Sequence, residues 1–401
     1  MPAGRCQVNA MHEAEGADRV GSALASDATI ESDDLKYWVG FNLVNGVGPV
    51  RFRRLLDVFG TAREAWNASA ATLTAAGMDP RCVESILAVR ARANLDRHLE
   101  RIAQRGITLL TWDDEDYPRQ LKNIHSAPPL IYVQGKLAPQ DEIAVAVVGT
   151  RRITVYGREC TMQLAGELAR HSITVVSGLA KGVDAMAHRA ALEASGRTIA
   201  VLGTGLDVVY PPENARLADE IARHGALITD YPLGTQPEAG NFPPRNRLIS
   251  GLSLGVLIVE AGDKSGALIT CDYALEQGRE VFAVPGNITS RMSAGTNRLI
   301  QQGAKLVTRV EDIVEELNLG MVAEQLVMRD VLPENEQEAA LLRSLTAEPI
   351  HVDEIVRASG LPVAEVSATL TMMELKGLVR QVGGMNYVIA REPGPVYGAA
   401  A

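Results

Sequence analysis

The sequence is short of the residues on which several classes of protein depend. Its 401 residues include four cysteines, none of them in a C-x-x-C pair, and these are Cys6, Cys82, Cys160 and Cys271. This spacing excludes a disulfide framework and a cysteine zinc site, so we expect reduced thiols in a cytoplasmic protein. No apolar run reaches the roughly 18–20 residues that a membrane helix needs, so we expect no membrane partner.

Positive charge is scarce as well. The chain has 39 lysines and arginines against 49 aspartates and glutamates, which gives a formal net charge of −10. A general basic coat for duplex DNA is therefore excluded, and any contact with nucleic acid must come from a local patch of basic side chains.

Common catalytic and cofactor motifs are also missing. The chain has neither the G-x-x-x-x-G-K-[S/T] loop of ATPases nor the G-x-S-x-G turn of serine hydrolases. Gly203-Thr204-Gly205 does not continue into G-x-G-x-x-G, and no acidic residue at the expected later strand end completes a dinucleotide fingerprint. These absences argue against P-loop ATP hydrolysis, serine-hydrolase chemistry and dinucleotide binding.

What the chain does have is a series of patterned segments. Its length and its 46% hydrophobic content predict more than one folded domain. We expect a disordered tail over residues 1–32, a small all-α domain over 33–105, a doubly wound, mostly parallel α/β domain over 106–319, a linker over 320–335, a winged-helix domain over 336–391 and a tail over 392–401.

Three apolar runs organise the α/β segment. Ile143–Val148 ends on Gly149-Thr150-Arg151, Ile173–Val176 ends on Ser177–Gly182, and Thr198–Leu202 ends on Gly203-Thr204-Gly205. Buried parallel strands with small residues at their carboxyl ends are typical of a doubly wound sheet, whose ligand lies outside those ends. Glycines let the backbone approach a phosphate, and Arg151 and Lys181 add positive charge. We therefore expect an anion site there.

The N-terminal segment predicts a helical hairpin. Leu35–Val44 and Val50–Phe59 read as helices on either side of Asn45-Gly46-Val47-Gly48-Pro49, which is a helix-hairpin-helix signature. Such a turn either holds a phosphate through backbone N–H groups or serves only as a packing hairpin. Further along, one long helix is expected from Arg81 to Gln104.

Toward the C-terminus, helices and a hairpin around Gly383-Gly384 indicate a winged helix, in which Ile350–Asp353 begins the second helix. The third helix, Pro362–Lys376, has Lys376 as its single basic residue. A DNA-reading helix is more basic than this, so the pattern favours a protein contact.

Other residues allow two interpretations each. Asp184 and His188 lie one helical turn apart and form either an acid/base pair or a helix anchor, and we favour the anchor. The acidic run Asp113–Asp116 is expected to be a solvated turn rather than a metal site. Glu260, at a strand end, is a candidate for hydrolysis of a nucleotide N-glycosidic bond, although no second carboxylate is placed to assist it.

The richest cluster is Asn241-Phe242-Pro243-Pro244-Arg245-Asn246-Arg247. An aromatic ring beside arginines and asparagines suits single-stranded nucleic acid, because the ring stacks on bases, guanidinium groups bind phosphates and amides reach base edges. The alternative is a helix start whose arginines pair with surface carboxylates. The neighbouring Arg151 and Lys181 favour the nucleic-acid interpretation.

Many of these segments match, in order, the motifs of a known family. Over about half of its length the sequence resembles the DNA-processing protein A (DprA/Smf) family. The matching segments are Gly149-Thr150-Arg151 with Tyr156-Gly157, Ser177–Asp184 with Ala187-His188, Gly203–Asp207 with Tyr210-Pro211 and Asn214, Phe242–Ser253, Val259–Ala261, Ser265–Thr270, and Val284–Gly286. The flanks agree, since the family often carries an N-terminal helix-hairpin-helix or sterile-alpha-like (SAM-like) domain and a C-terminal winged helix.

The resemblance implies a binder and mediator rather than an enzyme, with no cofactor. Members of the family bind single-stranded DNA in the pocket of an extended Rossmann-like domain and dimerise through that domain. They load the RecA recombinase onto incoming strands in natural transformation.

The resemblance also assigns roles to residues. Arg151 and Lys181 match the basic positions of the pocket, and Gly149, Thr150 and Gly178 match its backbone phosphate contacts. We therefore expect the nucleic-acid site to comprise Gly149, Thr150, Arg151, Ser177, Gly178, Lys181, Gly182, Asn241, Phe242, Arg245, Asn246 and Arg247.

Overall fold

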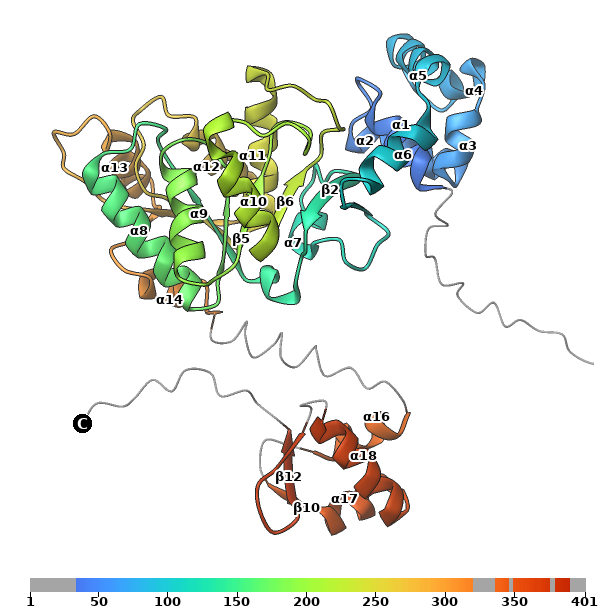
Figure 1. Cartoon of the computed structure of the whole chain (residues 1–401), viewed down its shortest axis with the longest axis vertical. Helices are drawn as coiled ribbons and strands as arrows, with labels where there is room; N and C mark the ends of the chain where they lie inside the picture. Colours follow the sequence, from blue (N-terminus) through green and yellow to red (C-terminus); the bar gives the residue numbers. More distant parts are fainter. Residues whose placement is uncertain (1–33, 320–335, 346–348, 376–378, 390–401) are drawn as a thin grey trace, which may run out of the picture.

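The computed structural model describes residues 34–319, 336–345, 349–375 and 379–389 (Figure 1). The expected tails over 1–32 and 392–401 and the expected linker over 320–335 lie outside the described residues.

Short helices form the N-terminal helical region. They are α1 Leu35–Asn42, α2 Pro49–Phe59, α3 Ala62–Asn67, α4 Ala70–Ala75, α5 Pro80–Arg92 and α6 Leu95–Ala103. Side-chain oxygens of Thr61, Ser69 and Asp79 accept backbone N–H groups in the first turns of α3, α4 and α5, which stabilises each helix start. The expected helix–turn–helix around Gly46 and Gly48 is present as α1 and α2.

One expectation in this region is wrong. The segment from Arg81 to Gln104 is two helices, not one, because the chain becomes extended at Ala93 and Asn94. The Asn94 side chain accepts the Arg97 N–H at 3.0 Å and so begins a new helix. An asparagine inside an apolar helical pattern is a local capping signal that periodicity alone does not detect.

The helical region is fixed to the sheet by aromatic packing. Trp38 of α1 and Phe52 of α2 contact Trp112, which follows the first strand, with ring centroids 6.3 and 6.1 Å away. Asn42, at the end of α1, donates to the Asp230 carbonyl and accepts from the Tyr132 hydroxyl, both at 3.0 Å. The two parts therefore share one apolar core.

A nine-stranded sheet is the centre of the described chain. Its strands are β1 Ile107–Thr111, β2 Leu130–Gly135, β3 Ala144–Val148, β4 Thr174–Ser177, β5 Thr198–Val201, β6 Ala226–Thr229, β7 Gly255–Ile258, β8 Glu280–Ala283 and β9 Lys305–Leu306. The spatial order is β1-β2-β6-β5-β4-β3-β7-β8-β9. Strand β2 pairs antiparallel with both β1 and β6. Every other neighbouring pair in the spatial order, from β6 across β3 to β9, is parallel. The expected mostly parallel α/β fold is confirmed.

The strand order reverses beside β3. Strands β4, β5 and β6 lie on one side of β3, whereas β7, β8 and β9 lie on the other. In open α/β sheets the loops that leave such a switch point diverge and open a crevice at the carboxyl ends of the strands. The loops after β3 and β7 meet here, because the Thr150 N–H donates to the Glu260 carbonyl at 2.7 Å.

Helices cover both faces of the sheet (Figure 1). They are α8 Val155–Arg170, α9 Val183–Glu193, α10 Ala215–His224, α11 Phe242–Gly251, α12 Ala267–Glu276, α13 Ala294–Gln301 and α14 Glu311–Glu316, with the short helix α7 Arg119–Lys122 near the sheet edge. Alternate residues of β3 belong to different cores: Ala144, Ala146 and Val148 join one cluster, while Val145 and Val147 join the other. That alternation is the two-residue period of a strand buried on both faces.

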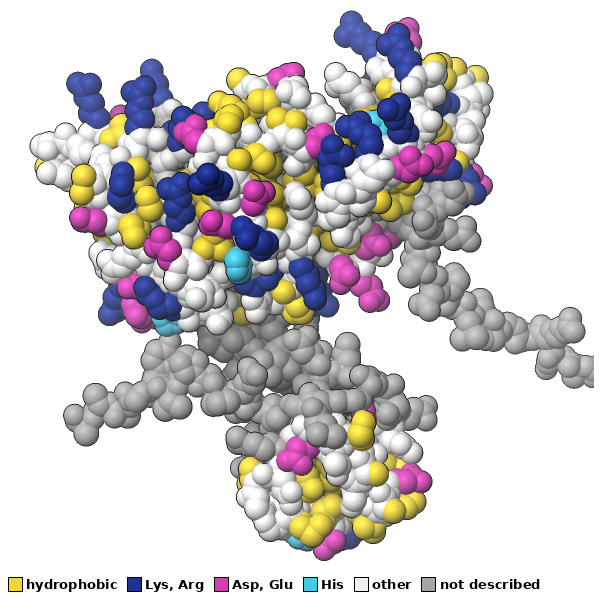
Figure 2. All heavy atoms as spheres, viewed as in Figure 1, with side chains coloured by type: hydrophobic (Ala, Val, Ile, Leu, Met, Phe, Trp, Pro, Cys, Tyr) yellow, Lys and Arg dark blue, Asp and Glu magenta, His cyan; other side chains and the backbone are white. Residues whose placement is uncertain are grey.

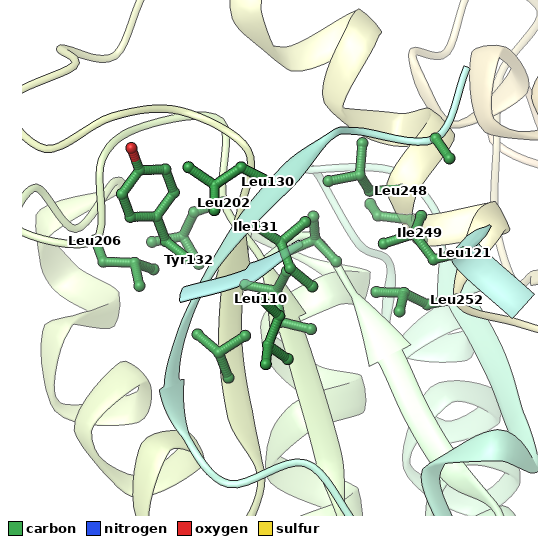
Figure 3. Packing of buried hydrophobic residues seen from close by; sticks show 14 of the residues in the cluster. Leu110, Leu121, Leu130, Ile131, Tyr132, Leu202, Leu206, Leu248, Ile249 and Leu252 are labelled. Carbon is green, nitrogen blue, oxygen red and sulfur yellow. The ribbon is translucent and has the colours of Figure 1, made fainter. Parts of the chain in front are cut away.

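The first cluster brings α11 and the antiparallel strands together. Leu248, Ile249 and Leu252, in and just after α11, lie in the same apolar cluster as Leu130 and Ile131 of β2 (Figure 3). This packing holds α11 against the antiparallel strands, and the first turns of α11 lie at the carboxyl ends of β4 and β5, where Arg245 donates to the Gly178 and Val201 carbonyls.

The winged-helix region has its own core. It contains α16 Glu336–Ser344, α17 Val352–Ser359 and α18 Val363–Leu375, with strands β10 Ile350–His351, β11 Val379–Gln381 and β12 Asn386–Ile389. The expectation that residues 350–353 all begin a helix is wrong for Ile350 and His351, which pair with β12 as a third strand. None of the helices within the described ranges is long and apolar enough to cross a membrane.

Candidate nucleic-acid site at the strand ends

A cleft of about 690 Å³ opens at the switch point of the sheet. Loops after β3, β4, β5, β6 and β7 and the first turns of α11 and α12 form its walls. The lining residues are Val148, Gly149, Thr150, Arg151, Arg152, Ala180, Asp184, Tyr210, Pro237, Ala239, Phe242, Pro243, Arg245, Asn246, Ile249, Ser265, Gly266, Ala267, Ile269 and Thr270. Its size lies within the usual range for a small-molecule or nucleotide-sized ligand.

Two exposed arginines stand at the rim of the cleft. Arg151 and Arg152 follow Thr150, whose hydroxyl accepts the Arg152 N–H at 3.1 Å. The loop after β4 passes directly beneath them: a Cβ on Gly182 would lie 2.2 Å from the Thr150 carbonyl oxygen. Only a glycine fits this approach, and Gly182 also has a φ of +79°. Basic side chains are thus presented at the rim of the cleft on a chain whose net charge is negative. Figure 2 shows that Lys and Arg side chains are elsewhere scattered over the visible face among acidic and hydrophobic ones.

An aromatic pair forms part of the wall. The rings of Phe242 and Tyr210 are 5.6 Å apart between centroids and tilted by 41°. The Arg151 guanidinium carbon lies 5.8 Å from the Phe242 centroid, and that of Arg245 lies at the same distance. Positive charge and aromatic surface are therefore adjacent in the cleft.

Arg245 forms the floor rather than the rim. It is 4% exposed and donates to the carbonyl oxygens of Gly178, at 2.8 Å, and Val201. These carbonyls end β4 and β5, so Arg245 holds α11 against both strands. Burial lowers the pKa of Arg245 to about 10, while Asp184 nearby acts to raise it. The side chain is still charged at neutral pH.

Asp184 and His188 anchor the helix α9. The Asp184 carboxylate accepts the N–H groups of Gly178 and Ala180 at 3.2 and 3.3 Å, which shapes the loop after β4. His188 does not pair with Asp184; its Nδ1 lies 2.6 Å from the Thr198 hydroxyl. Because that hydroxyl donates to the Val175 carbonyl at 2.7 Å, the His188 Nδ1–H must be the donor to Thr198. These contacts support the anchoring interpretation.

The structure brings only part of the predicted site into the cleft lining. Gly149, Thr150, Arg151, Phe242, Arg245 and Asn246 line it, whereas Ser177, Gly178, Lys181, Gly182, Asn241 and Arg247 do not. Lys181 is exposed beside the cleft and pairs with Glu213 at 2.5 Å. Asn241 donates to the Gln236 carbonyl at 3.3 Å, within the loop that precedes α11.

Four of the predicted site residues have hydrogen-bond partners within the fold. Arg247, which we expect at a phosphate, is largely buried and donates to the Asp230 carboxylate and the Ser126 carbonyl. Ser177 is fully buried and donates to the Val147 carbonyl, joining β4 to β3. The N–H groups of Thr150 and Gly178, expected to meet phosphate, already donate to Glu260 and Asp184. Polar groups inside a fold bond to one another first, because an unpaired buried donor is costly.

Glu260 lies beneath a separate hollow of about 710 Å³, beside Tyr156, Pro285 and Ser293. It is 2% exposed, and its two carboxylate oxygens accept the N–H and the hydroxyl of Thr154 at 3.0 and 2.8 Å. A carboxylate at the start of α8 stabilises the helix through its first-turn N–H groups. The geometry therefore gives Glu260 a structural role at the α8 start.

The acidic run also has a local explanation. Asp114 accepts the N–H and the hydroxyl of Thr111 at 2.6 and 2.8 Å, which closes the turn after β1. Among the residues that the structure describes, no group of three or more histidine, cysteine, aspartate or glutamate side chains is placed to hold a metal ion.

The sequence does not predict that Arg152, Tyr210 and Ser265–Thr270 line the cleft. Signals for them exist in the sequence, because Arg152 adjoins Arg151, and Tyr210 and Ser265–Thr270 belong to motifs of the family. What the sequence did not provide was proximity, since Tyr210 and Phe242 meet across 32 positions of the chain.

Comparisons with known proteins agree with one another. Residues 108–318 match the model of the DNA recombination-mediator protein A family, and residues 329–385 match a DprA winged helix domain. Protein Smf of Synechocystis sp. is 38% identical over 388 residues, covering 88% of this chain and 98% of its own. The DNA processing protein DprA of Bacillus subtilis is 44% identical over 224 residues, covering 56% of this chain and 75% of its own.

A solved structure has the same architecture. DNA processing protein A (DprA) from Streptococcus pneumoniae aligns with a TM-score of 0.63 at 36% identity, covering 70% of this chain and 97% of that one.

Proposed function

The chain belongs to the DNA recombination-mediator protein A family, and from that premise we propose that it binds single-stranded DNA in the cleft at the strand ends. The observation that carries the proposal is the adjacency of two exposed arginines, Arg151 and Arg152, to the Phe242–Tyr210 ring pair in one cleft. Arginines neutralise phosphates, and aromatic rings stack on bases of any sequence. Their combination suits a flexible single strand better than a duplex, whose bases are already stacked.

Each part of the cleft has a distinct task in this proposal. Arg151 and Arg152 bind phosphates at the rim, where their guanidinium groups form no hydrogen bond to the described residues and can each form two parallel ones to a phosphate. Lys181 adds to this rim, because its surface ion pair with Glu213 contributes at most about 1 kcal/mol and a phosphate can replace Glu213. Arg245 keeps its carbonyl contacts and contributes positive potential from the floor.

We propose a binding protein rather than an enzyme. The alternative of nucleotide N-glycosidic hydrolysis depends on Glu260, and both of its oxygens are occupied by Thr154. Hydrolysis of a glycosidic bond generally needs two carboxyl groups about the scissile bond, and Glu260 is the single carboxylate that the described part of the chain places in the lining of its hollow.

The family resemblance supplies the finer proposal. We infer that the protein acts in the cytoplasm, forms a homodimer and loads RecA onto incoming DNA in natural transformation. A dimer would join two clefts into one longer track, which raises avidity without new contacts. The rate at which RecA assembles on a labelled single strand should rise when the protein is added, and no change in that rate would contradict the loading proposal.

The binding proposal is tested by fluorescence anisotropy with a labelled oligo-dT. The double variant Arg151→Ala/Arg152→Ala should bind about 10- to 100-fold more weakly than the wild type, because each charged hydrogen bond contributes about 1.5–3 kcal/mol when fully formed and less at an exposed rim. Unchanged affinity in this variant would contradict the proposal.

The matched control is Arg170→Ala/Arg223→Ala. Both residues are exposed arginines, but they lie in the last turns of α8 and α10, at the opposite edge of the sheet from the cleft. This control removes the same charge, so its affinity should stay within about twofold of the wild type at moderate salt, where charges farther away than about 10 Å are screened.

A further inference from the structure

The aromatic ring of Tyr210 is not part of the buried apolar clusters of the described chain. It is 40% exposed, and it lines the cleft beside Phe242. Full burial of a large aromatic ring would contribute to stability, yet this ring is left partly open to the cleft.

The loop that carries Tyr210 is held in place. Pro211, the next residue, is buried, and Asn214 donates to the Leu179 carbonyl at 2.9 Å, tying this loop to the one after β4. Thr204 donates to the Val208 carbonyl at 2.6 Å and closes the preceding turn. The exposed ring is therefore held at a fixed place on the cleft wall, so little conformational entropy is lost when something stacks on it.

Phe242 is less available than Tyr210. The guanidinium groups of Arg151 and Arg245 both lie 5.8 Å from its ring centroid. A Cβ on Gly203 would lie 3.0 Å from the Phe242 Cδ1, so the ring also packs on the backbone after β5. Phe242 is thus half-buried against protein groups, and Tyr210 is the more exposed ring of the pair.

We propose that a base of the bound strand stacks on Tyr210, with Phe242 as the support behind that ring and Arg151 holding a neighbouring phosphate. This inference rests on the proposed function and adds to it the residue that recognises the base. Because every base has a π-face, the contact selects bases without reading their sequence. The ring is needed and the hydroxyl is not.

The experiment compares two ligands that differ only in their bases. One is a labelled oligo-dT, and the other is a labelled oligomer of the same length built from stable abasic nucleotides, which keeps the phosphates. Affinities are measured for the full-length wild type, Tyr210→Ala and Tyr210→Phe. The control is Tyr156→Ala, since Tyr156 is 45% exposed but lies at the other hollow, outside the cleft lining.

Tyr210→Ala should lose about 5- to 150-fold in affinity for oligo-dT, which is the range for one stacked base, and change by less than about twofold on the abasic oligomer. Tyr210→Phe should retain the affinity of the wild type, and Tyr156→Ala should lose equally little on both ligands. Tryptophan fluorescence verifies the fold, since Trp38, Trp66 and Trp112 all lie outside the cleft.

Two results would overturn the inference while leaving the proposed function standing. One is an unchanged affinity of Tyr210→Ala for oligo-dT. The other is an equal loss on the two ligands, which would make Tyr210 a structural residue. If the wild type binds neither ligand at low salt, the proposed function itself fails, and this outcome is distinct from the other two.

Discussion

The cleft at the strand ends and the winged-helix region both carry motifs that suggest contact with nucleic acid, and they expose opposite kinds of side chain. The cleft presents Arg151, Arg152 and Tyr210. Helix α18, in the position of a recognition helix, contains no lysine or arginine over Val363–Leu375 and exposes Val363, Glu365 and Met372. Among the coloured side chains on the visible face of the winged helix in Figure 2, hydrophobic and acidic ones prevail.

The difference shows that a fold motif alone does not assign a ligand. A helix that enters the major groove meets phosphates on both sides, so it needs positive charge on its exposed face. Helix α18 lacks that charge, and its exposed Val363 and Met372 suit a protein surface better. The cleft owes its chemistry to loops that the sheet brings together, and function follows from these side chains.

The largest expected effect is a loss of stability when Arg245, at the floor of the cleft, is replaced, compared with Arg151 at the rim. Arg245→Ala leaves Asp184 buried without its nearest positive charge and removes the donor from the Gly178 and Val201 carbonyls. We expect the free energy of unfolding to fall by about 3–5 kcal/mol. Urea unfolding followed by tryptophan fluorescence checks this, because all three tryptophans lie in residues 38–112 and report on the shared core rather than on the winged helix.

The control for this prediction is Arg151→Ala, an exposed position where the free energy of unfolding should change by less than about 0.5 kcal/mol. If Arg245→Ala is as stable as Arg151→Ala, the assignment of Arg245 to the floor is wrong.

A moderate effect is expected on the stability of the fold at acidic pH, through the buried His188 of α9. Burial lowers the pKa of His188 to about 3, from 6.5 in an unfolded chain. Below pH 6.5 the unfolded state therefore binds a proton that the folded state does not, and stability falls as the pH decreases toward 3. The contribution approaches about 1.4 kcal/mol per pH unit. The urea midpoint of the wild type should fall more steeply between pH 6.5 and 4.5 than that of His188→Gln, and parallel slopes would contradict a neutral buried His188.

The smallest expected effect is on the winged helix. The full-length variant Ala368→Glu/Met372→Glu places two negative charges on the exposed face of α18. If this helix does not contact DNA, affinity for oligo-dT and for duplex DNA should change by less than about twofold in anisotropy titrations. A loss of affinity of tenfold or more for either ligand would show that α18 contacts DNA, and it would contradict the difference proposed between the winged helix and the cleft.

The sequence predicts the sheet more completely than it predicts the site. Strands such as Ala144–Val148 are apolar throughout and end on glycine, and that pattern is local, so it can be read from the chain. The site depends on which polar groups remain free after folding. Arg245 and Arg247 look equivalent to Arg151 in the sequence, yet they bond to Gly178, Val201 and Asp230, which lie far away along the chain.

The same reasoning explains the remaining errors. Asn94 interrupts a helical pattern through a single side-chain contact with Arg97. His351 pairs with Asn386 across 35 positions, so Ile350–His351 becomes a strand although its pattern suits a helix. The first case is decided by a local side-chain cap and the second by pairing between distant segments, and composition and periodicity predict neither.

The most direct test of the central claim is the salt dependence of oligo-dT binding, measured for the wild type and for Arg151→Ala/Arg152→Ala. Each phosphate neutralised on a single strand contributes about 0.7 to the slope of log K against log salt concentration. If both arginines bind phosphates, the slope of the variant should be smaller in magnitude by about 1.4. An equal slope in the two proteins would show that the phosphates are bound elsewhere, and it would contradict the placement of DNA in the cleft.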